Sequence, residues 1–163
     1  MLLGATVAAV CVSFVRPGLA PAIALCDARG FPRALIALPG GILTHAFTHS
    51  VHQTRVDESF RVSAGTLELF ETRFDTYGVG IPTDAGDGFR DEDGRFVVLM
   101  TRRFDTLPVR VSHLPGDGLL VGGKLREFTE WFKAQDLVVI RPVLLPDCMK
   151  SFATEARSRG VGK

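Results

Sequence analysis

The chain has 163 residues, enough for one domain with a substantial core and too few for two comfortable ones. Its 19 basic and 18 acidic residues nearly balance, so no global field favours nucleic acid or an anionic membrane surface. The 12 Phe, against one Trp and one Tyr, favour a packed core over an exposed aromatic binding surface.

The first fifteen residues carry no charged side chain and are mostly apolar. They fall short of the about 20 that a membrane-spanning helix needs. They are closer to the apolar core of a signal peptide, with a small-residue cleavage site at Ala20-Pro21-Ala22, although no Lys or Arg precedes them. We expect a signal peptide or N-terminal anchor at 1–22, one β domain at 23–149 and a flexible tail at 150–163. A truncated start or a buried first strand is the alternative.

Export would place the domain in the periplasm or elsewhere outside the cytoplasm. Cleavage near Ile23 would leave two cysteines, Cys26 and Cys148, near the two ends of the mature chain. In an oxidising compartment this pair could form a disulfide that ties the first strand to the last, although spacing alone does not show it.

Beyond this segment, short apolar runs separated by turn residues predict an antiparallel all-β sandwich or barrel of about eight strands. The runs that we interpret as strands are Ala22 to Asp27, Ala34 to Leu38, Ile42 to Val51, Val56 to Ser63, Thr66 to Thr76, Arg95 to Met100, Leu107 to His113, Gly118 to Val121 and Leu137 to Leu144. One short helix is predicted at Lys124 to Gln135, where apolar residues recur at helical spacing.

Three charged or titratable residues are predicted to share a buried face. A hairpin turn centred on Gln53-Thr54 would pair His49 with Glu58, and one centred on Ala64-Gly65 would pair Glu58 with Glu71. Arg73 is the nearest cation. Buried carboxylates need partners, so these residues predict either a structural polar network or a binding site.

A metal site is the weaker interpretation, because His45 and His49 lie about 13 Å apart on a strand. Ser50 follows His49 directly, but neighbours on a strand point to opposite faces, which excludes a serine hydrolase pair. The glycines of the segment after the longest strand favour a bend that could shape the rim of a pocket. The candidate ligand-binding residues are therefore His49, Ser50, Glu58, Glu71, Arg73, Tyr77, Gly78 and Gly80.

Several segments carry a family resemblance: Phe47 to Val51, Glu58, Glu71 to Phe74, Tyr77 to Pro82, Asp93 to Val98 and Val121 to Gly123. They resemble a small bacterial and archaeal family catalogued as domain of unknown function 1850. The resemblance implies no known activity. It implies an exported accessory protein, because such proteins are typically encoded beside tripartite ATP-independent periplasmic (TRAP) transporters whose solute receptors are of the TAXI type.

The leading hypothesis is a non-enzymatic, extracytoplasmic domain that assists a TRAP-type transporter, by contacting its membrane or receptor subunits or by holding a small solute. No cofactor, metal or nucleic-acid partner is expected. One alternative is a small enzyme in which His49 and Glu58 or Glu71 act as acid and base. The other is a purely structural β domain whose polar residues fix the strand register.

Overall fold

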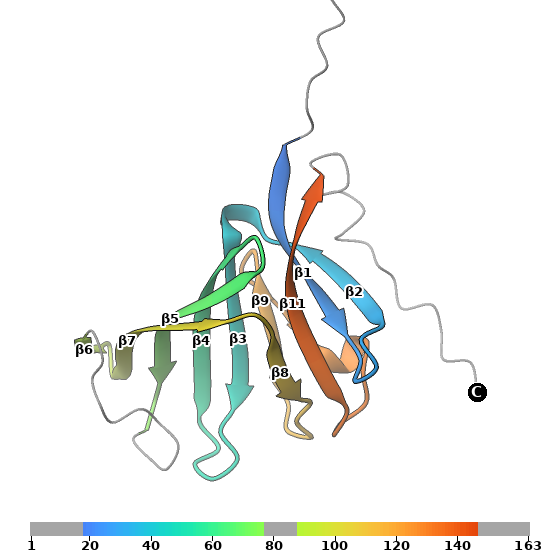
Figure 1. The fold of residues 1–163 in the computed structure, drawn as a ribbon. Coiled ribbons are helices and arrows are strands. Elements are labelled where there is room, and N and C mark those ends of the chain that lie inside the picture. Colours follow the sequence, from blue (N-terminus) through green and yellow to red (C-terminus); the bar gives the residue numbers. More distant parts are fainter. Residues whose placement is uncertain (1–17, 77–87, 147–163) are drawn as a thin grey trace, which may run out of the picture.

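The computed structural model describes residues 18–76 and 88–146, and these residues form β-strands with two short 3-10 turns (Figure 1). The strands are β1 (Leu19–Cys26), β2 (Pro32–Ala37), β3 (Ile42–Thr48), β4 (Arg55–Ser63), β5 (Thr66–Phe74), β6 (Gly88–Glu92), β7 (Arg95–Phe104), β8 (Leu107–Arg110), β9 (Gly118–Val121), β10 (Lys124–Glu127) and β11 (Leu137–Pro146). The turns are η1 (Pro39–Gly41) and η2 (Phe128–Glu130). The predicted all-β fold is confirmed.

Two antiparallel sheets build the sandwich. One has four strands in the order β2-β1-β11-β8, and the other has seven in the order β10-β9-β3-β4-β5-β7-β6. The chain passes from the larger sheet to the smaller one between β7 and β8, after only two residues, Asp105 and Thr106. The predicted strands all have counterparts here, while β6 and β10 were not predicted as strands.

The core lies between the two sheets and follows from the alternation of apolar residues along the strands. Ile23 of β1 and Ile140 of β11 come from the smaller sheet, and Leu43, Phe60 and Leu67 come from the larger one. All five side chains are fully buried. Burying apolar side chains between two sheet faces is the main driving force for such a fold.

The predicted helix at Lys124 to Gln135 is wrong. Gly122 and Gly123 have φ values of 57° and 78°, which is the backbone of a two-residue hairpin turn with both central residues left-handed. This turn pairs β10 with β9, so the first four residues of the expected helix extend the sheet. Only η2 is helical in the remainder. The hairpin turn therefore overrides the helical spacing of the apolar residues.

Strand β1 begins at Leu19, within the expected leader, and lies between β2 and β11. Ala22, the residue before the expected cleavage point, is fully buried. Cleavage before Ile23 stays a prediction, and it would remove the first half of a central strand.

The expected disulfide is wrong, because Cys26 is a free, buried thiol. Strand β11 runs antiparallel to β1 and places Val139 opposite Cys26, whereas Pro146 lies opposite Leu19. Leu19 is seven residues from Cys26, about 23 Å along the strand. Cys148 lies outside the described residues.

Within the described part of the chain, no helix has the length and apolar character to cross a membrane.

Candidate functional site

A polar row crosses the inner face of the larger sheet, as predicted, but its members differ. Strand pairing places His45 of β3 opposite Glu58 of β4, and Glu58 opposite Thr72 of β5. Asp117, just before β9, contacts His45 from the other side. We call these four residues, His45, Glu58, Thr72 and Asp117, the His45 cluster.

Asp117 is the fixed end of the cluster. Its Oδ1 lies 3.3 Å from Nε2 of His45, and its Oδ2 accepts a 2.6 Å hydrogen bond from the backbone N–H of Ser112. Its backbone carbonyl also accepts a hydrogen bond from the N–H of Phe128. The Asp117 carboxylate is therefore held in one orientation and holds the imidazole in turn.

Aromatic rings enclose the imidazole of His45. Its ring centroid lies 4.9 Å from that of Phe47, in a stacked arrangement, and 5.7 Å from that of Phe128. The side chain of His45 is 8% exposed and that of Asp117 is 5% exposed, whereas that of Glu58 is 28% exposed. Glu58 is thus the member through which the cluster reaches solvent.

Two buried polar atoms beside Glu58 have no hydrogen-bond partner in the described structure: Nδ1 of His45 and Oγ1 of Thr72. Nδ1 is 3.7 Å from Oε2 of Glu58, too far for a hydrogen bond but close enough for charge attraction. Native proteins rarely leave such atoms unsatisfied without a water, an ion or a ligand to complete them. The cluster therefore has open hydrogen-bonding positions next to a partly exposed carboxylate.

The environment favours a protonated His45. Burial alone lowers the pKa of the imidazole, but the hydrogen bond to Asp117 and the nearby Glu58 carboxylate outweigh burial and raise the pKa above its ordinary value. The cluster therefore sets two carboxyl groups, those of Asp117 and Glu58, around a single imidazole.

His49, predicted to face Glu58, lies instead in the loop between β3 and β4. This loop spans residues 49–54, because Thr48 pairs with Arg55, and so the predicted two-residue turn at Gln53-Thr54 is wrong. Nδ1 of His49 lies 3.3 Å from the backbone N–H of Val51, from which it accepts a hydrogen bond. His49 caps its own turn, which takes it out of the strand. Ser50 is exposed in the same loop.

The hairpin at Ala64-Gly65 is confirmed, since Ser63 pairs with Thr66, but the pairing shifts between Ser59 and Phe60. A β-bulge at Phe70 accounts for the shift. Because of it, Glu71 lies opposite Ser59, and Glu58 lies opposite Thr72. The predicted Glu58–Glu71 pair is therefore wrong.

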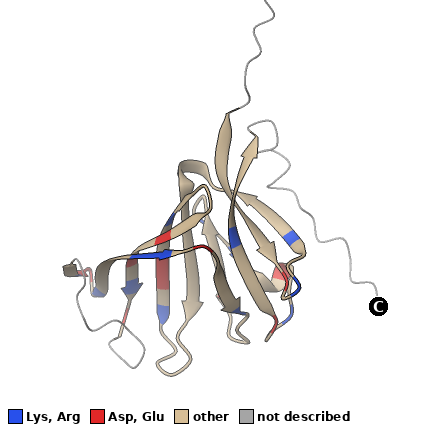
Figure 2. Cartoon of the chain, viewed as in Figure 1, with Lys and Arg blue, Asp and Glu red and all other residues tan. Residues whose placement is uncertain are grey.

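Glu71 and Arg73 lie together on the outer face of the larger sheet. Nε of Arg73 donates a 2.6 Å hydrogen bond to Oε1 of Glu71, and Nη1 of Arg73 is 3.1 Å from Oε2 of Glu92. In Figure 2, the ribbon positions of charged residues, coloured blue and red, are spread over β4, β5 and β7 of this sheet. The four residues expected to form one cluster are thus separated. His49 lies in the turn, Glu58 faces the core, and Glu71 and Arg73 lie on the outer surface of the sheet.

Three further candidates, Tyr77, Gly78 and Gly80, lie outside the described residues. Among the residues that are described, no group of three or more His, Cys, Asp and Glu is arranged to hold a metal ion.

Thr72 and Asp117 were missed by sequence reasoning. Thr72 points inward only because of a one-residue bulge, and the local sequence does not predict this bulge. Asp117 is 72 residues from His45 in sequence, so only the pairing of β9 with β3 brings them together. The available signal was an Asp inside a Pro- and Gly-rich turn, which also fits an ordinary solvated turn residue.

A family model with the description "Domain of unknown function (DUF1850)" matches residues 43–128, more than half of the chain. The matched segment begins in β3, ends in η2 and contains all four residues of the His45 cluster. No curated protein and no solved structure matches the chain.

Proposed function

Because the chain belongs to the DUF1850 family, whose description assigns no activity, we propose its function from its own residues. We propose a non-enzymatic binding domain that acts outside the cytoplasm beside a TRAP-type secondary transporter and holds a small polar solute at the His45 cluster.

The observation that carries the proposal is the incomplete hydrogen bonding around Glu58. A purely structural network would be expected to satisfy its buried atoms, since each unsatisfied one costs about 1 to 3 kcal/mol. Here Nδ1 of His45 and Oγ1 of Thr72 are both open beside a carboxylate that solvent reaches. A solute that donates to Glu58 and Thr72 and offers an acceptor to the Nδ1–H of His45 would complete the cluster.

The cluster has two carboxyl groups and only one imidazole, and this excess of acidic groups selects the chemistry of the solute. An ammonium or hydroxyl group can donate to Glu58, whereas a carboxylate would be repelled. The transporter as partner rests on the resemblance to proteins encoded beside TRAP transporters, and the extracytoplasmic location rests on the leader-like first residues.

Solute binding is tested by thermal unfolding in the presence of ethanolamine, glycerol or succinate. We expect ethanolamine to raise the melting temperature, because a ligand that binds only the folded state stabilises it, and succinate to leave it unchanged. Glu58→Gln should abolish the shift. Glu68→Gln, which alters a carboxylate of similar exposure on the outer face, is the matched control and should preserve it.

If no probe shifts the melting temperature, or if Glu58→Gln responds like the parent, the solute proposal is wrong and the cluster is structural. The partner is tested separately by co-purification of the full chain with TRAP membrane and receptor subunits from native membranes. Recovery of the chain in the cytoplasmic fraction would overturn the extracytoplasmic proposal.

A small enzyme is the second candidate, and the pairing of a buried imidazole with a partly exposed carboxylate favours it. His45 replaces His49 in this proposal, and Glu58 remains, whereas Glu71 lies on the other face of the sheet. Turnover of p-nitrophenyl acetate that is lost in folded His45→Gln and Glu58→Gln variants would favour the enzyme over the binding domain.

A further inference from the structure

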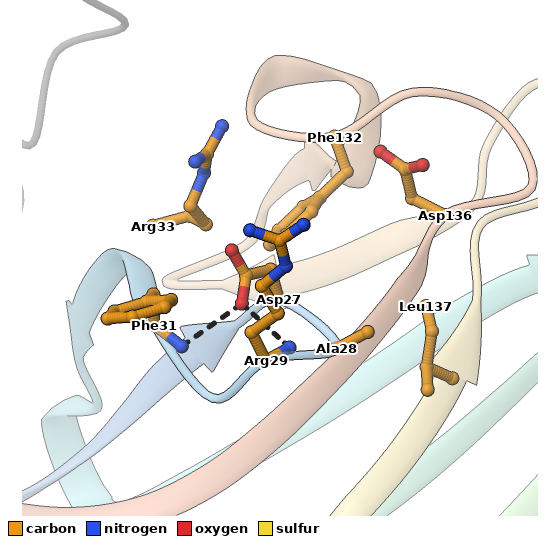
Figure 3. Close-up of a pocket in the computed structure, with 8 residues that line it drawn as sticks. All are labelled: Asp27, Ala28, Arg29, Phe31, Arg33, Phe132, Asp136 and Leu137. Carbon is orange, nitrogen blue, oxygen red and sulfur yellow. Dashed lines mark hydrogen bonds between the residues drawn. The ribbon is translucent and has the colours of Figure 1, made fainter.

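A second site lies at the end of the sandwich, between the β1–β2 turn and the loop that leads into β11. It is a pocket of about 410 Å³, within the range of small-ligand sites. Figure 3 shows Arg29 in the middle of the pocket, with Phe31 and Arg33 on one side and Phe132 and Asp136 on the other. None of its lining residues belongs to the His45 cluster.

The two carboxylates of the pocket hold its walls. Oδ1 of Asp27 accepts hydrogen bonds of 3.0 Å from the backbone N–H groups of Arg29 and Phe31 (Figure 3). Oδ2 of Asp136 accepts one of 2.9 Å from the N–H of Lys133. These bonds fix the two loops through side chain to backbone contacts, as in Asx turns. Both acidic groups are thus engaged in shaping the pocket.

The two arginines that line the pocket, Arg29 and Arg33, differ from its carboxylates in their contacts. Neither Arg29 nor Arg33 forms an ion pair with any residue in the described ranges, although other arginines of the chain, such as Arg73 and Arg95, do. A third guanidinium, that of Arg141, lies at the same turn, with Nη2 3.6 Å from the position of a Cβ on Gly30. Unpaired guanidinium groups at a concave site are suited to bind a carboxylate or another anion.

Aromatic rings supply the rest of the lining. Phe31 is 63% exposed, an unusual state for so large an apolar side chain, whereas Phe132, which also lines the pocket, is buried. A flat apolar ligand would remove the Phe31 ring from water at about 25 cal/mol per Å² of buried area. Exposed aromatic surface next to cations therefore favours a ligand with both an apolar plane and a negative charge.

We propose that this pocket binds a small aromatic carboxylate, with the carboxylate at Arg29 and Arg33 and the ring against Phe31 and Phe132. The proposal does not depend on the solute at the His45 cluster. The pocket would give the domain a second, chemically opposite specificity: an anion here and a donor-bearing solute at Glu58.

The test uses 2-naphthoate and its neutral analogue 2-naphthamide, titrated into the ¹⁵N-labelled chain and followed by NMR. We expect saturable shifts for 2-naphthoate at residues 27–33 and 132–137, and weaker binding of the amide by about tenfold, as expected when one charge-assisted contact is lost. The double variant Arg29→Gln/Arg33→Gln should bind naphthoate no better than the parent binds the amide.

Two further variants separate the contributions. Phe31→Ala should weaken both ligands, because it removes apolar contact and no charge. Arg102→Gln, an exposed arginine of β7 outside the pocket, is the matched control and should leave binding unchanged. Equal affinity for acid and amide, unchanged binding in the double arginine variant, or shifts away from the two loops would overturn the proposal. Because Glu58→Gln leaves the pocket intact, it should bind naphthoate like the parent, which keeps this test distinct from that of the solute.

Discussion

At the scale of single residues, His45 is a buried titratable side chain that lies between two carboxyl groups. A buried imidazole needs partners, and Asp117 and Glu58 supply charge on its two sides. His49 has the same side chain but uses it to cap a surface turn. The two histidines are four residues apart, and only the backbone conformation decides which one is part of the core.

Asp117→Asn should lower the free energy of unfolding by about 2 to 4 kcal/mol, because it removes the charge that pairs with a buried imidazolium. Urea denaturation measures the loss. Asp75→Asn is the matched control, since this half-exposed carboxylate pairs with Arg95 at the surface, and it should cost less than about 1 kcal/mol. Equal losses in the two variants would show that burial of the pair adds nothing.

Stability should also depend on pH through His45. The pKa is raised above 6.5 in the folded protein, so the folded state binds the proton more tightly than the unfolded state. This contribution is fully present below about pH 6.5 and is lost as the pH rises through the folded-state pKa. The free energy of unfolding should therefore fall over that range in the parent and fall less in His45→Gln. His113→Gln, at an exposed position, should retain the parent's slope.

At the scale of elements, hairpin turns and one bulge set the positions of the site residues. The six-residue loop after β3 sets the register that places His45 opposite Glu58. The bulge at Phe70 sets the register that places Thr72 opposite Glu58. Strand β9 then brings Asp117 to His45, and β10 closes this edge of the sheet. The cluster therefore depends on the close approach of β9 and β10.

At Gly118 the backbone of β10 lies directly against β9. A Cβ at this position would lie 2.2 Å from the backbone oxygen of Arg126, and backbone cannot move aside as a flexible side chain can. Gly118→Ala should therefore destabilise the fold by about 3 kcal/mol, at the upper end for overpacking. Gly65→Ala has open space but a φ of 78°, and should cost about 1 kcal/mol. Chemical denaturation of the two variants distinguishes the cost of a steric contact from that of backbone strain. Equal losses of unfolding free energy would refute the close approach of β9 and β10 at Gly118.

At the scale of the whole molecule, β1 joins the first described residues to the last. It pairs with β11 along its full length, from Leu19 opposite Pro146 to Cys26 opposite Val139. The smaller sheet thus depends on residues that the sequence assigns partly to a leader.

A chain that begins at Ile23 should be less stable than one that begins at Gly18, by about 2 kcal/mol, because it loses several ladder hydrogen bonds with β11. Denaturation of the two chains side by side measures the difference. Identical stability would mean that the first half of β1 contributes little. The mass of the chain isolated from its natural host then shows whether cleavage occurs before Ile23 or leaves β1 whole.

The sequence was sufficient for those features that short stretches of chain control. Alternating apolar residues and Gly-containing turns predicted the all-β fold, most strand positions and the hairpin at Ala64-Gly65. It also predicted that Glu58 lies on the core face beside a histidine, because Val56 and Phe60 share its face. These features depend on interactions between near neighbours in the sequence, which a periodicity of two reveals.

Only the tertiary structure decided which partners meet Glu58. A loop of six residues in place of two, and a bulge of one residue, changed the register and so exchanged His49 for His45 and Glu71 for Thr72. Asp117 joined through strand pairing between distant segments, and the Gly122-Gly123 turn made a strand where helical spacing predicted a helix. The register is set by the free energy of packing a whole sheet face, to which every strand contributes. A short stretch of sequence therefore cannot predict it.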